Sequence, residues 1–206
     1  MISSIFVLGL SSSFLGALPL GMLNITVLKL SLEGKIRAAF GFALGAICIE
    51  FFQIAITLFA MQKLLTIPFF ATLLTIISIP ILLFLGFQSF KTPPPSINAP
   101  KMAGEAAFQH HFLTGIKLSA ANVLIYPFWL LWGNIFLQNG WFYAQASHFL
   151  TFSLGASLGT LGAFAVFIVL GKLISPYLSR FQHIFGAVVG VAFIGFAFLQ
   201  CFKLFQ

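Results

Sequence analysis

The stretch Pro19-Leu20-Gly21-Met22-Leu23-Asn24 interrupts the first long apolar run of the chain. Proline removes a backbone donor and clashes with the preceding helical turn, and glycine lowers helix propensity. Asn24 then places an amide inside an apolar segment. Within a bilayer, non-helical backbone is tolerated only where it contacts protein or lines a water-filled cavity. We therefore expect Pro19, Gly21 and Asn24 to form a break that faces the protein interior, with a simple proline kink as the alternative.

The composition is that of an all-α integral membrane protein. Of 206 residues, 60% are hydrophobic and 6% are charged, whereas soluble domains carry about 25% charged residues. A bilayer-spanning helix needs about 20 apolar residues, and six such runs fill the chain. We therefore predict six transmembrane helices in a single domain, residues 1–206, with no soluble domain. The runs lie at about 2–30, 36–61, 69–90, 111–136, 147–170 and 181–202.

The basic residues set the expected orientation. The net charge is +7, but Lys and Arg are spread through the connections between apolar runs, a pattern that does not indicate a nucleic-acid partner. Eight of the ten Lys and Arg fall on one side of the predicted spans. The positive-inside rule makes that side cytoplasmic. We thus expect a multi-pass protein of a bacterial-type inner membrane, with its N-terminus and C-terminus on the non-cytoplasmic side.

The two halves of the chain share short motifs. Phe42-Ala43-Leu44-Gly45-Ala46 reappears as Phe152-Ser153-Leu154-Gly155-Ala156, and Phe84-Leu85-Gly86-Phe87 reappears at nearly the same offset as Phe193-Ile194-Gly195-Phe196. Because each half holds three spans, the second copy must cross the membrane in the opposite direction. We predict two inverted three-helix repeats, at about 2–90 and 108–204, joined by a proline-rich linker at 91–107. The alternative is two halves that share only their composition.

The fourth span contains a second break at the position that the repeat predicts. Asn122 and Pro127 interrupt its apolar run. A pair of interrupted spans in corresponding halves of a transporter is the best sequence indication of a solute site. We therefore expect helices 1 and 4 to be broken, and their breaks to meet near the midplane around a polar solute.

Glu50 is the one acidic residue inside an apolar run. Ionisable residues at that depth are costly and by default mark a functional site. Gln53 and Thr57 follow it on one helical face, and Ser157 and Thr160 occupy a comparable face of the fifth span. Because removal from water favours the neutral form of a carboxyl, Glu50 is the candidate for proton coupling or for holding a solute ammonium group. The alternative is a protonated structural carboxyl.

These motifs resemble the lysine-exporter (LysE/RhtB) family over nearly the whole chain. Pro19 to Asn24 is similar to the family's first-span signature of proline, glycine, proline and asparagine, and Glu50 falls where many related exporters carry an acidic residue. Two positions depart from the pattern, because Met22 and Val123 stand where the family usually has proline. Other similar positions are Gly34, Lys35, Arg37, Leu44-Gly45-Ala46 and Phe112-Leu113-Thr114-Gly115 leading to Asn122.

The resemblance implies gradient-driven export of amino acids or similar small polar solutes, a fold of two inverted three-span repeats, and a homodimer. The resulting hypothesis is a proton-coupled secondary transporter that works by alternating access. Two alternatives share a six-span plan: a thiol-redox electron relay, which needs a cysteine pair, and a divalent-cation transporter, which needs more oxygen ligands than one carboxylate. We expect no cofactor, no metal site and no enzymatic activity, because no metal-ligand or nucleophile–base pattern occurs.

Overall fold

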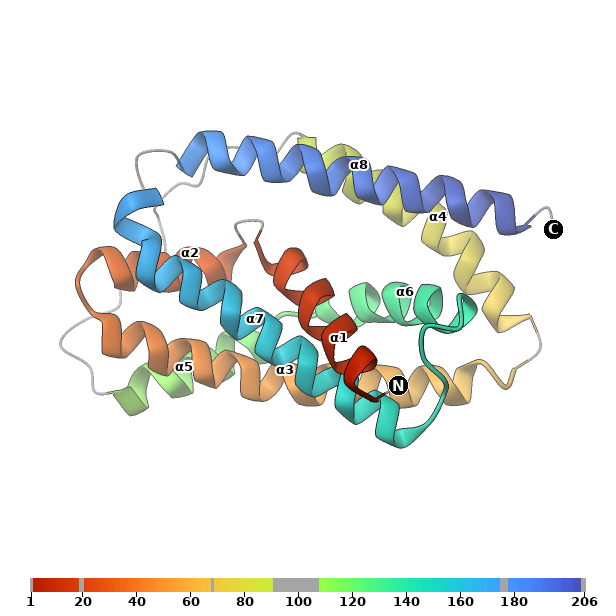
Figure 1. The fold of residues 1–206 in the computed structure, drawn as a ribbon, viewed down its shortest axis with the longest axis horizontal. Helices are drawn as coiled ribbons and strands as arrows, with labels where there is room; N and C mark the ends of the chain where they lie inside the picture. Colours follow the sequence, from red (N-terminus) through yellow and green to blue (C-terminus); the bar gives the residue numbers. More distant parts are fainter. Residues whose placement is uncertain (1, 19–20, 68, 91–107, 175–177, 205–206) are drawn as a thin grey trace.

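The computed structural model describes residues 2–18, 21–67, 69–90, 108–174 and 178–204. The regular secondary structure of these residues is helical (Figure 1). This all-helical architecture agrees with the sequence prediction. The elements are α1 (Ile2–Ala17), α2 (Met22–Leu32), α3 (Ile36–Leu64), α4 (Phe70–Phe90), α5 (Phe108–Ala120), α6 (Ile125–Gln138), α7 (Ala146–Ile174) and α8 (Leu178–Leu204).

Two of the predicted spans are bent helix pairs. The first consists of α1 and α2, whose axes differ by 74°, and the fourth consists of α5 and α6, which differ by 65°. By length and apolar composition, α3 and the 146–171 part of α7 can each cross a membrane, and each bent pair would add one further span. The described residues therefore hold two to four candidate spans, and the predicted linker at 91–107 lies outside them.

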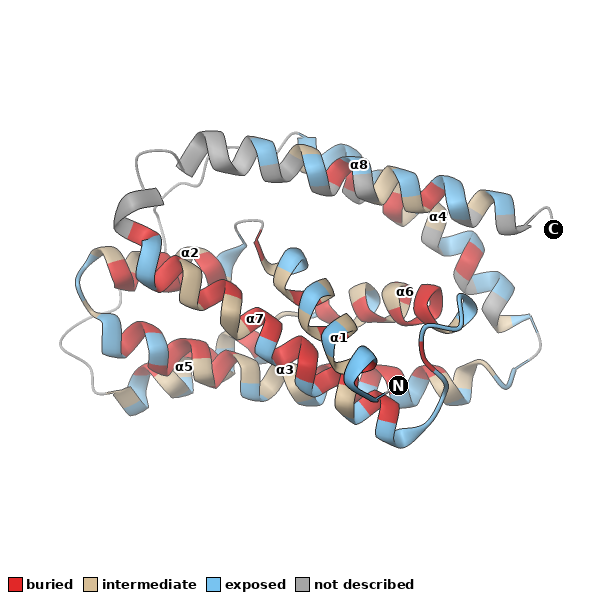
Figure 2. Cartoon of the chain, viewed as in Figure 1, coloured by how far each residue is buried: buried red, intermediate tan, exposed pale blue. Residues whose placement is uncertain are grey.

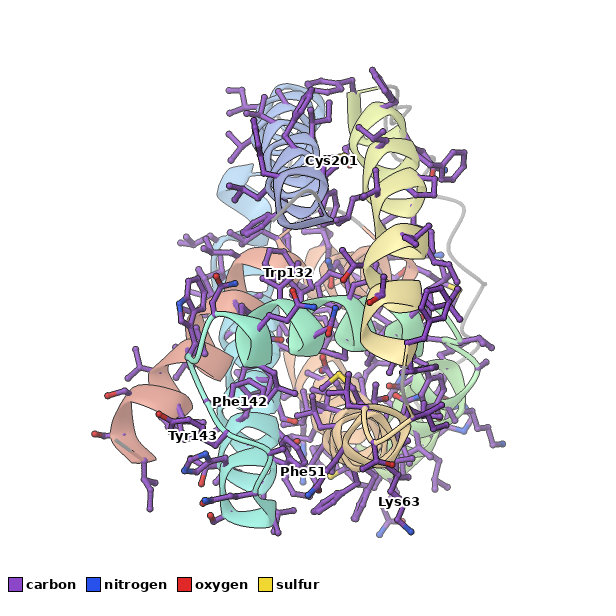
Figure 3. The ribbon with its side chains drawn as sticks, turned by 90° about the vertical axis from the view of Figure 1, so that its right-hand side faces the viewer. Phe51, Lys63, Trp132, Phe142, Tyr143 and Cys201 are labelled. Carbon is purple, nitrogen blue, oxygen red and sulfur yellow. The ribbon has the colours of Figure 1, made fainter. Side chains whose placement is uncertain are left out.

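The two long helices α3 and α7 lie side by side at the centre of the molecule. Helix α1 packs along α7, and α5 packs along α3. Helices α4 and α8 pack against each other at one edge of the molecule (Figures 1 and 3). The half-helices α2 and α6 contact α7 and α3 respectively, so the elements of one half of the chain pack mainly on those of the other half.

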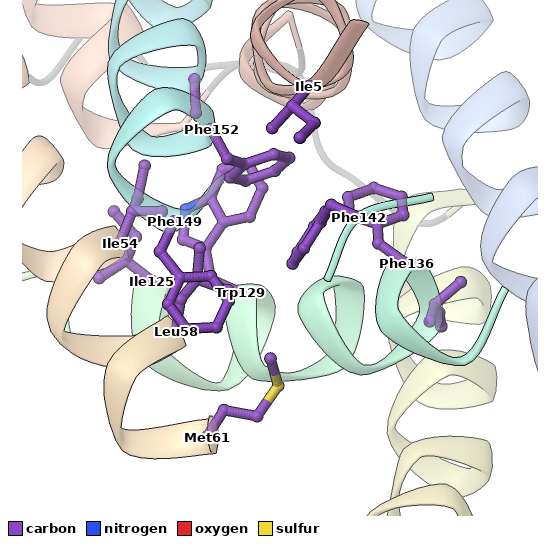
Figure 4. Close-up of a cluster of buried hydrophobic side chains, with 12 residues drawn as sticks. Ile5, Ile54, Leu58, Met61, Ile125, Trp129, Phe136, Phe142, Phe149 and Phe152 are labelled. Carbon is purple, nitrogen blue, oxygen red and sulfur yellow. The ribbon is translucent and has the colours of Figure 1, made fainter. Parts of the chain in front are cut away.

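The packed interior lies where these helices meet. One apolar cluster joins α1, α3, α6 and α7 around Trp129 and Phe152, whose rings meet edge to face at 5.4 Å (Figure 4). A second joins α2, α3 and α7 around Phe42 and Phe164. Buried positions are dense along α3 and α7 and sparse along the described parts of α4 and α8 (Figure 2). Helices α3 and α7 thus form the core on which the broken helices rest.

The outer faces of the central helices are apolar. On α3 the exposed side chains include Phe52, Ile56 and Phe59, which share one helical face, and on α7 they include Leu150 and Leu154. The same two helices bury polar side chains, listed here together: Gln53, Thr57, Ser153, Ser157 and Thr160. Apolar residues outside and polar residues inside suit a helix that lies in lipid.

Glycines allow α1 to cross α7 with the backbones in direct contact. A Cβ atom at Gly9 would collide with the carbonyl oxygen of Phe152 and lie 3.0 Å from the amide nitrogen of Ala156. In return, a Cβ atom at Gly155 would collide with the carbonyl oxygen of Phe6. Small residues of this kind are typical of close helix packing in membranes.

The crossing of α3 with α5 has the same arrangement, except that here the long central helix comes from the first half of the chain and the broken helix from the second half. A Cβ atom at Gly115 would collide with the Phe42 carbonyl oxygen and lie 3.0 Å from the Ala46 amide nitrogen, and one at Gly45 would collide with the Phe112 carbonyl oxygen. Phe42 and Ala46 belong to the motif that recurs at Phe152 and Ala156. The two crossings therefore use corresponding residues of the two halves.

Helices α4 and α8 also contact each other reciprocally. A Cβ atom at Gly86 would lie 2.8 Å from a side-chain carbon of Ile194, and one at Gly190 would lie 2.8 Å from the ring of Phe90. A Cβ atom at Gly190 would also lie 2.9 Å from the Gly86 carbonyl oxygen, so Gly86 and Gly190 lie next to each other. Gly195 has no neighbour within 4 Å of its Cβ position.

We expect Gly45→Leu to destabilise the protein by at least about 2 kcal/mol, because a side chain there overpacks a backbone contact. This corresponds to a Tm lower by about 4–8 °C for a chain of this size. Thermal unfolding of the purified protein in detergent measures the change. Gly195→Leu is the matched control and should leave Tm within about 2 °C. Wild-type stability of Gly45→Leu would show that the α3–α5 crossing is wrong.

Candidate functional site

A cavity of about 660 Å³ lies between the two helix breaks. Its volume is within the range of about 300–1,000 Å³ that is typical of small-molecule sites. The ends of α1 and α5, the starts of α2 and α6, and one side each of α3 and α7 form its walls. The lining residues are Ser13, Gly16, Ala17, Gly21, Met22, Leu23, Asn24, Glu50, Ser119, Ala121, Asn122, Val123, Leu124, Ile125, Phe128, Trp129, Thr160 and Phe164.

Three side chains form a hydrogen-bonded chain along the cavity wall. The Thr160 hydroxyl donates to Oε1 of Glu50 at 2.9 Å, and the hydroxyl oxygens of Ser13 and Thr160 are 2.7 Å apart. Because Thr160 has a single hydroxyl proton, Ser13 must be the donor to Thr160 while Thr160 donates to Glu50. The Thr160 hydroxyl of α7 thus joins Ser13 of α1 to the Glu50 carboxyl of α3.

The register of the glycine crossings places these side chains. Ser13 lies four residues after Gly9 on α1, and Thr160 lies four residues after Ala156 on α7. Residues four apart lie on the same helix face, so the contact of Gly9 with Ala156 is followed one turn later by that of Ser13 with Thr160. The same four-residue step leads from Gly115 to Ser119 on α5 and from Ala46 to Glu50 on α3. Both Ser119 and Glu50 line the cavity.

Side-chain amides bond to carbonyls near the ends of α1 and α5. The last four carbonyls of a helix lack helical partners. Nδ2 of Asn24 donates to the Ala17 carbonyl at 2.6 Å across the first break. Nε2 of Gln53 donates to the Ser119 carbonyl at 3.2 Å beside the second. The breaks are therefore held by specific hydrogen bonds inside the protein.

Both helices that begin after the breaks start at the cavity. Gly21 precedes α2 with an extended backbone, φ −92° and ψ 178°, and α6 begins at Ile125 after Leu124. The first amides of a helix lack helical acceptors and favour anions. At the start of α6, however, the amides of Ile125 and Tyr126 already donate to the carbonyls of Asn122 at 3.4 Å and Val123 at 3.3 Å. Pro127 lies in the first turn of α6, where a missing N–H costs no helical hydrogen bond.

The structure brings five of the predicted residues together around one cavity. Gly21, Asn24, Glu50, Asn122 and Thr160 line it. The breaks that carry Gly21 and Asn122 belong to different halves of the chain, and they meet at this cavity beside the carboxyl.

The other predicted residues lie elsewhere. Gln53 donates to the Ser119 carbonyl at the end of α5 and does not line the cavity. Thr57 donates to the Gln53 carbonyl of its own helix at 2.6 Å. Ser157 donates to the Ser153 carbonyl of its own helix at 2.9 Å. Pro127 is not among the lining residues either, and Pro19 falls outside the described residues. The predicted polar stripe on α3 and α7 therefore contributes one residue, Thr160, to the lining in addition to Glu50.

Sequence reasoning missed several lining residues. Ser13 stands in a run of three serines, a pattern that does not by itself indicate a site. Aligning Gly9 with Gly115 in the repeat would have matched Ser13 with Ser119. The aromatic wall, formed by Phe128, Trp129 and Phe164, carried no signal because 28 residues of the chain are phenylalanine.

A cavity between two interrupted helix pairs, with one carboxyl on its wall, is typical of a membrane transporter. The sequence model of the LysE type translocator family matches residues 14–202. The chain belongs to this family. The predicted family is thus confirmed, and the protein is a multi-pass membrane translocator.

One curated relative is similar over most of its length. It is named "Putative amino acid efflux protein YcgF", from Bacillus subtilis (strain 168), and is 26% identical over 159 residues, which cover 77% of this chain and 74% of the relative. A search of the solved structures gave no significant match.

A double-mutant cycle tests the link between α1 and α7. We expect Ser13→Ala and Thr160→Val to show a coupling energy of about 0.5–1.5 kcal/mol, the net contribution of one buried hydrogen bond. The free energy of unfolding in detergent is the measured quantity. Ser12→Ala is the control, because Ser12 bonds to the Gly9 carbonyl of its own helix and should be additive with Thr160→Val within about 0.3–0.5 kcal/mol. Additivity of the first pair would show that the two hydroxyls do not interact.

Proposed function

We propose that this translocator exports amino acids, or similar small polar solutes, by alternating access with proton coupling at Glu50. The observation that carries the proposal is the meeting of both helix breaks and Glu50 at one cavity. The name of the Bacillus subtilis relative, which specifies amino acid efflux, supports the choice of solute.

The cavity offers complementary groups for the two ends of an amino acid. The Glu50 carboxylate would pair with the solute ammonium group, since charge-assisted hydrogen bonds are the stronger kind. The start of α2 after Gly21 would receive the solute carboxylate, because the first amides of a helix and the helix dipole favour an anion there. In other transporters, the N-termini of broken half-helices likewise point at anionic groups of the substrate.

The presence of a single carboxyl among the described lining residues supports proton coupling. Glu50 can hold a proton or pair with an ammonium group, but one carboxylate cannot do both fully at once. A proton that arrives from outside would displace the solute, and its release to the cytoplasm would leave the carboxylate ready for the next solute. Export would then be driven by the inward proton gradient.

Alternating access would use the two halves of the chain as inverted repeats. The reciprocal glycine contacts, α1 on α7 and α5 on α3, support this arrangement, because corresponding residues make both. Glu50 and Thr160 occupy corresponding positions, 110 residues apart, and bond to each other. The α1–α7 and α5–α3 crossings would then be related to each other about the Thr160–Glu50 bond. Such an arrangement would allow an inward-open and an outward-open state of similar energy.

For topology, we propose six spans in a bacterial-type inner membrane with both termini outside. The charge distribution supports this orientation. At the side expected outside, Nε2 of Gln62 donates to the Ala144 carbonyl at 3.1 Å. At the side expected inside, the Ser31 hydroxyl donates to the Ile168 carbonyl at 2.6 Å. Each bond joins segments that this topology places on the same side. The homodimer that the family resemblance implies stays part of this proposal.

The alternatives gain no support from the site. The described residues contain no group of three or more His, Cys, Asp or Glu side chains that could hold a metal ion. Cys48 and Cys201 are free thiols on α3 and α8, and neither lines the cavity. A divalent cation would lack ligands here, and an electron relay would lack its cysteine pair.

Replacing Glu50 should separate coupling from folding. We expect Glu50→Gln to abolish proton-driven amino acid transport in proteoliposomes, because an amide of similar size cannot exchange a proton. Glu33→Gln is the matched control: Glu33 forms a surface ion pair with Lys35 at 3.0 Å, and its loss should leave the transport rate within about twofold, since surface pairs contribute little. Full gradient-driven flux in Glu50→Gln would show that Glu50 is not the coupling residue.

Cysteine labelling tests the orientation. In a Cys48→Ser/Cys201→Ser background, we expect an impermeant thiol reagent to label Ser3→Cys and Gln145→Cys in intact cells, and to label Glu33→Cys only after permeabilisation. All three residues are exposed. Labelling of Glu33→Cys in intact cells would reverse the topology.

A further inference from the structure

We infer that the solute is a neutral amino acid with a large apolar side chain, rather than a cationic or acidic one. This inference rests on the proposed function, and it concerns the part of the cavity that does not meet the solute's ammonium and carboxylate groups.

The charge of the lining excludes a second ionised group on the solute. Among the described residues that line the cavity, Glu50 is the one ionisable side chain. One carboxylate can balance one ammonium group, so the side-chain charge of lysine or arginine would have no partner there. An acidic side chain would meet Glu50 with no basic residue to offset the repulsion. Burying a charge without a partner is strongly unfavourable.

The remaining wall includes tightly packed aromatic side chains. Trp129 and Phe164 have at most 2% of their surface exposed, yet both line the cavity together with Phe128. The ring of Trp129 is held edge to face by Phe128 at 5.0 Å and by Phe152 at 5.4 Å. A solute with an apolar side chain would find this surface already formed and would displace water from it.

Three polar side chains of the wall already hold hydrogen bonds within the protein. The hydroxyls of Ser13 and Thr160 belong to the chain that ends on Glu50, and the Asn24 amide donates to the Ala17 carbonyl. A solute side chain with its own hydroxyl or amide would have to compete with these bonds. An apolar side chain makes no such demand.

Competition binding tests the inference on the full chain in lipid nanodiscs, with radiolabelled L-leucine as the probe. We expect L-leucine and L-phenylalanine to bind at least about tenfold more tightly than L-alanine, since single methylenes in apolar pockets contribute about tenfold or more. L-lysine and L-glutamate should be the weakest competitors. Binding of L-lysine at the strength of L-leucine, or no preference for leucine over alanine, would overturn the inference and leave amino acid export standing. Absence of binding by any amino acid would overturn the proposed function as well.

Two variants test the wall itself. Phe128→Ser should weaken L-leucine binding at least about fivefold and leave L-alanine binding unchanged, whereas Phe198→Ser, on the exposed face of α8, should change neither.

Leu124 is 77% exposed and lines the cavity, so Leu124→Glu adds a second carboxylate with little risk to folding. We expect it to strengthen L-lysine binding at least about tenfold relative to Leu124→Gln. Unchanged lysine binding in Leu124→Glu would show that the charge of the lining does not set the preference.

Discussion

The hydrogen bond between Thr160 and Glu50 joins the two central helices at the wall of the cavity. In an apolar environment such a bond has little competition from water, and an unpaired polar group would be costly. It orients the Glu50 carboxyl, and Ser13 in turn contacts the Thr160 hydroxyl from α1. The position of a broken helix is therefore linked, through the Thr160 hydroxyl, to the carboxyl that faces the cavity.

That bond depends on the close approach of backbones at the glycine crossings. Gly9 permits α1 to contact α7, and Gly115 permits α5 to contact α3. One helical turn after Gly9 and Gly115, α1 and α5 reach the cavity, and each of them ends shortly afterwards at its break. Where the helices end, the Asn24 amide bonds to the Ala17 carbonyl. The Gln53 amide bonds to the Ser119 carbonyl, which also accepts the Asn122 N–H at 3.0 Å. The cavity is the space that the two ended helices leave between α3 and α7.

Much of this architecture could be predicted from the sequence, because the apolar runs give the helix positions to within a few residues. The breaks were predictable from proline, glycine and asparagine in apolar segments, and Glu50 from its charge. The face of α3 was harder. Gln53 and Thr57 share the polar stripe with Glu50, but helical periodicity cannot tell whether a residue meets the cavity or the neighbouring α5. Partners from distant segments, such as Ser13, depend on the register of a crossing that only the packed structure reveals.

The two halves differ where the chemistry would take place. In the proposed inverted repeats, corresponding positions carry a carboxyl, Glu50, and a hydroxyl, Thr160, which lie in contact. Two carboxylates at this distance would repel each other, and one would have to stay protonated. A hydroxyl can donate to a carboxylate and can accept from a carboxylic acid. The contact between α3 and α7 can therefore persist whether Glu50 carries a proton or not. In the proposed exchange, Glu50 would give up the solute ammonium group for a proton, and the solute would leave the cavity without disrupting the contact between α3 and α7. The broken helices packed on α3 and α7 would then be the parts that move.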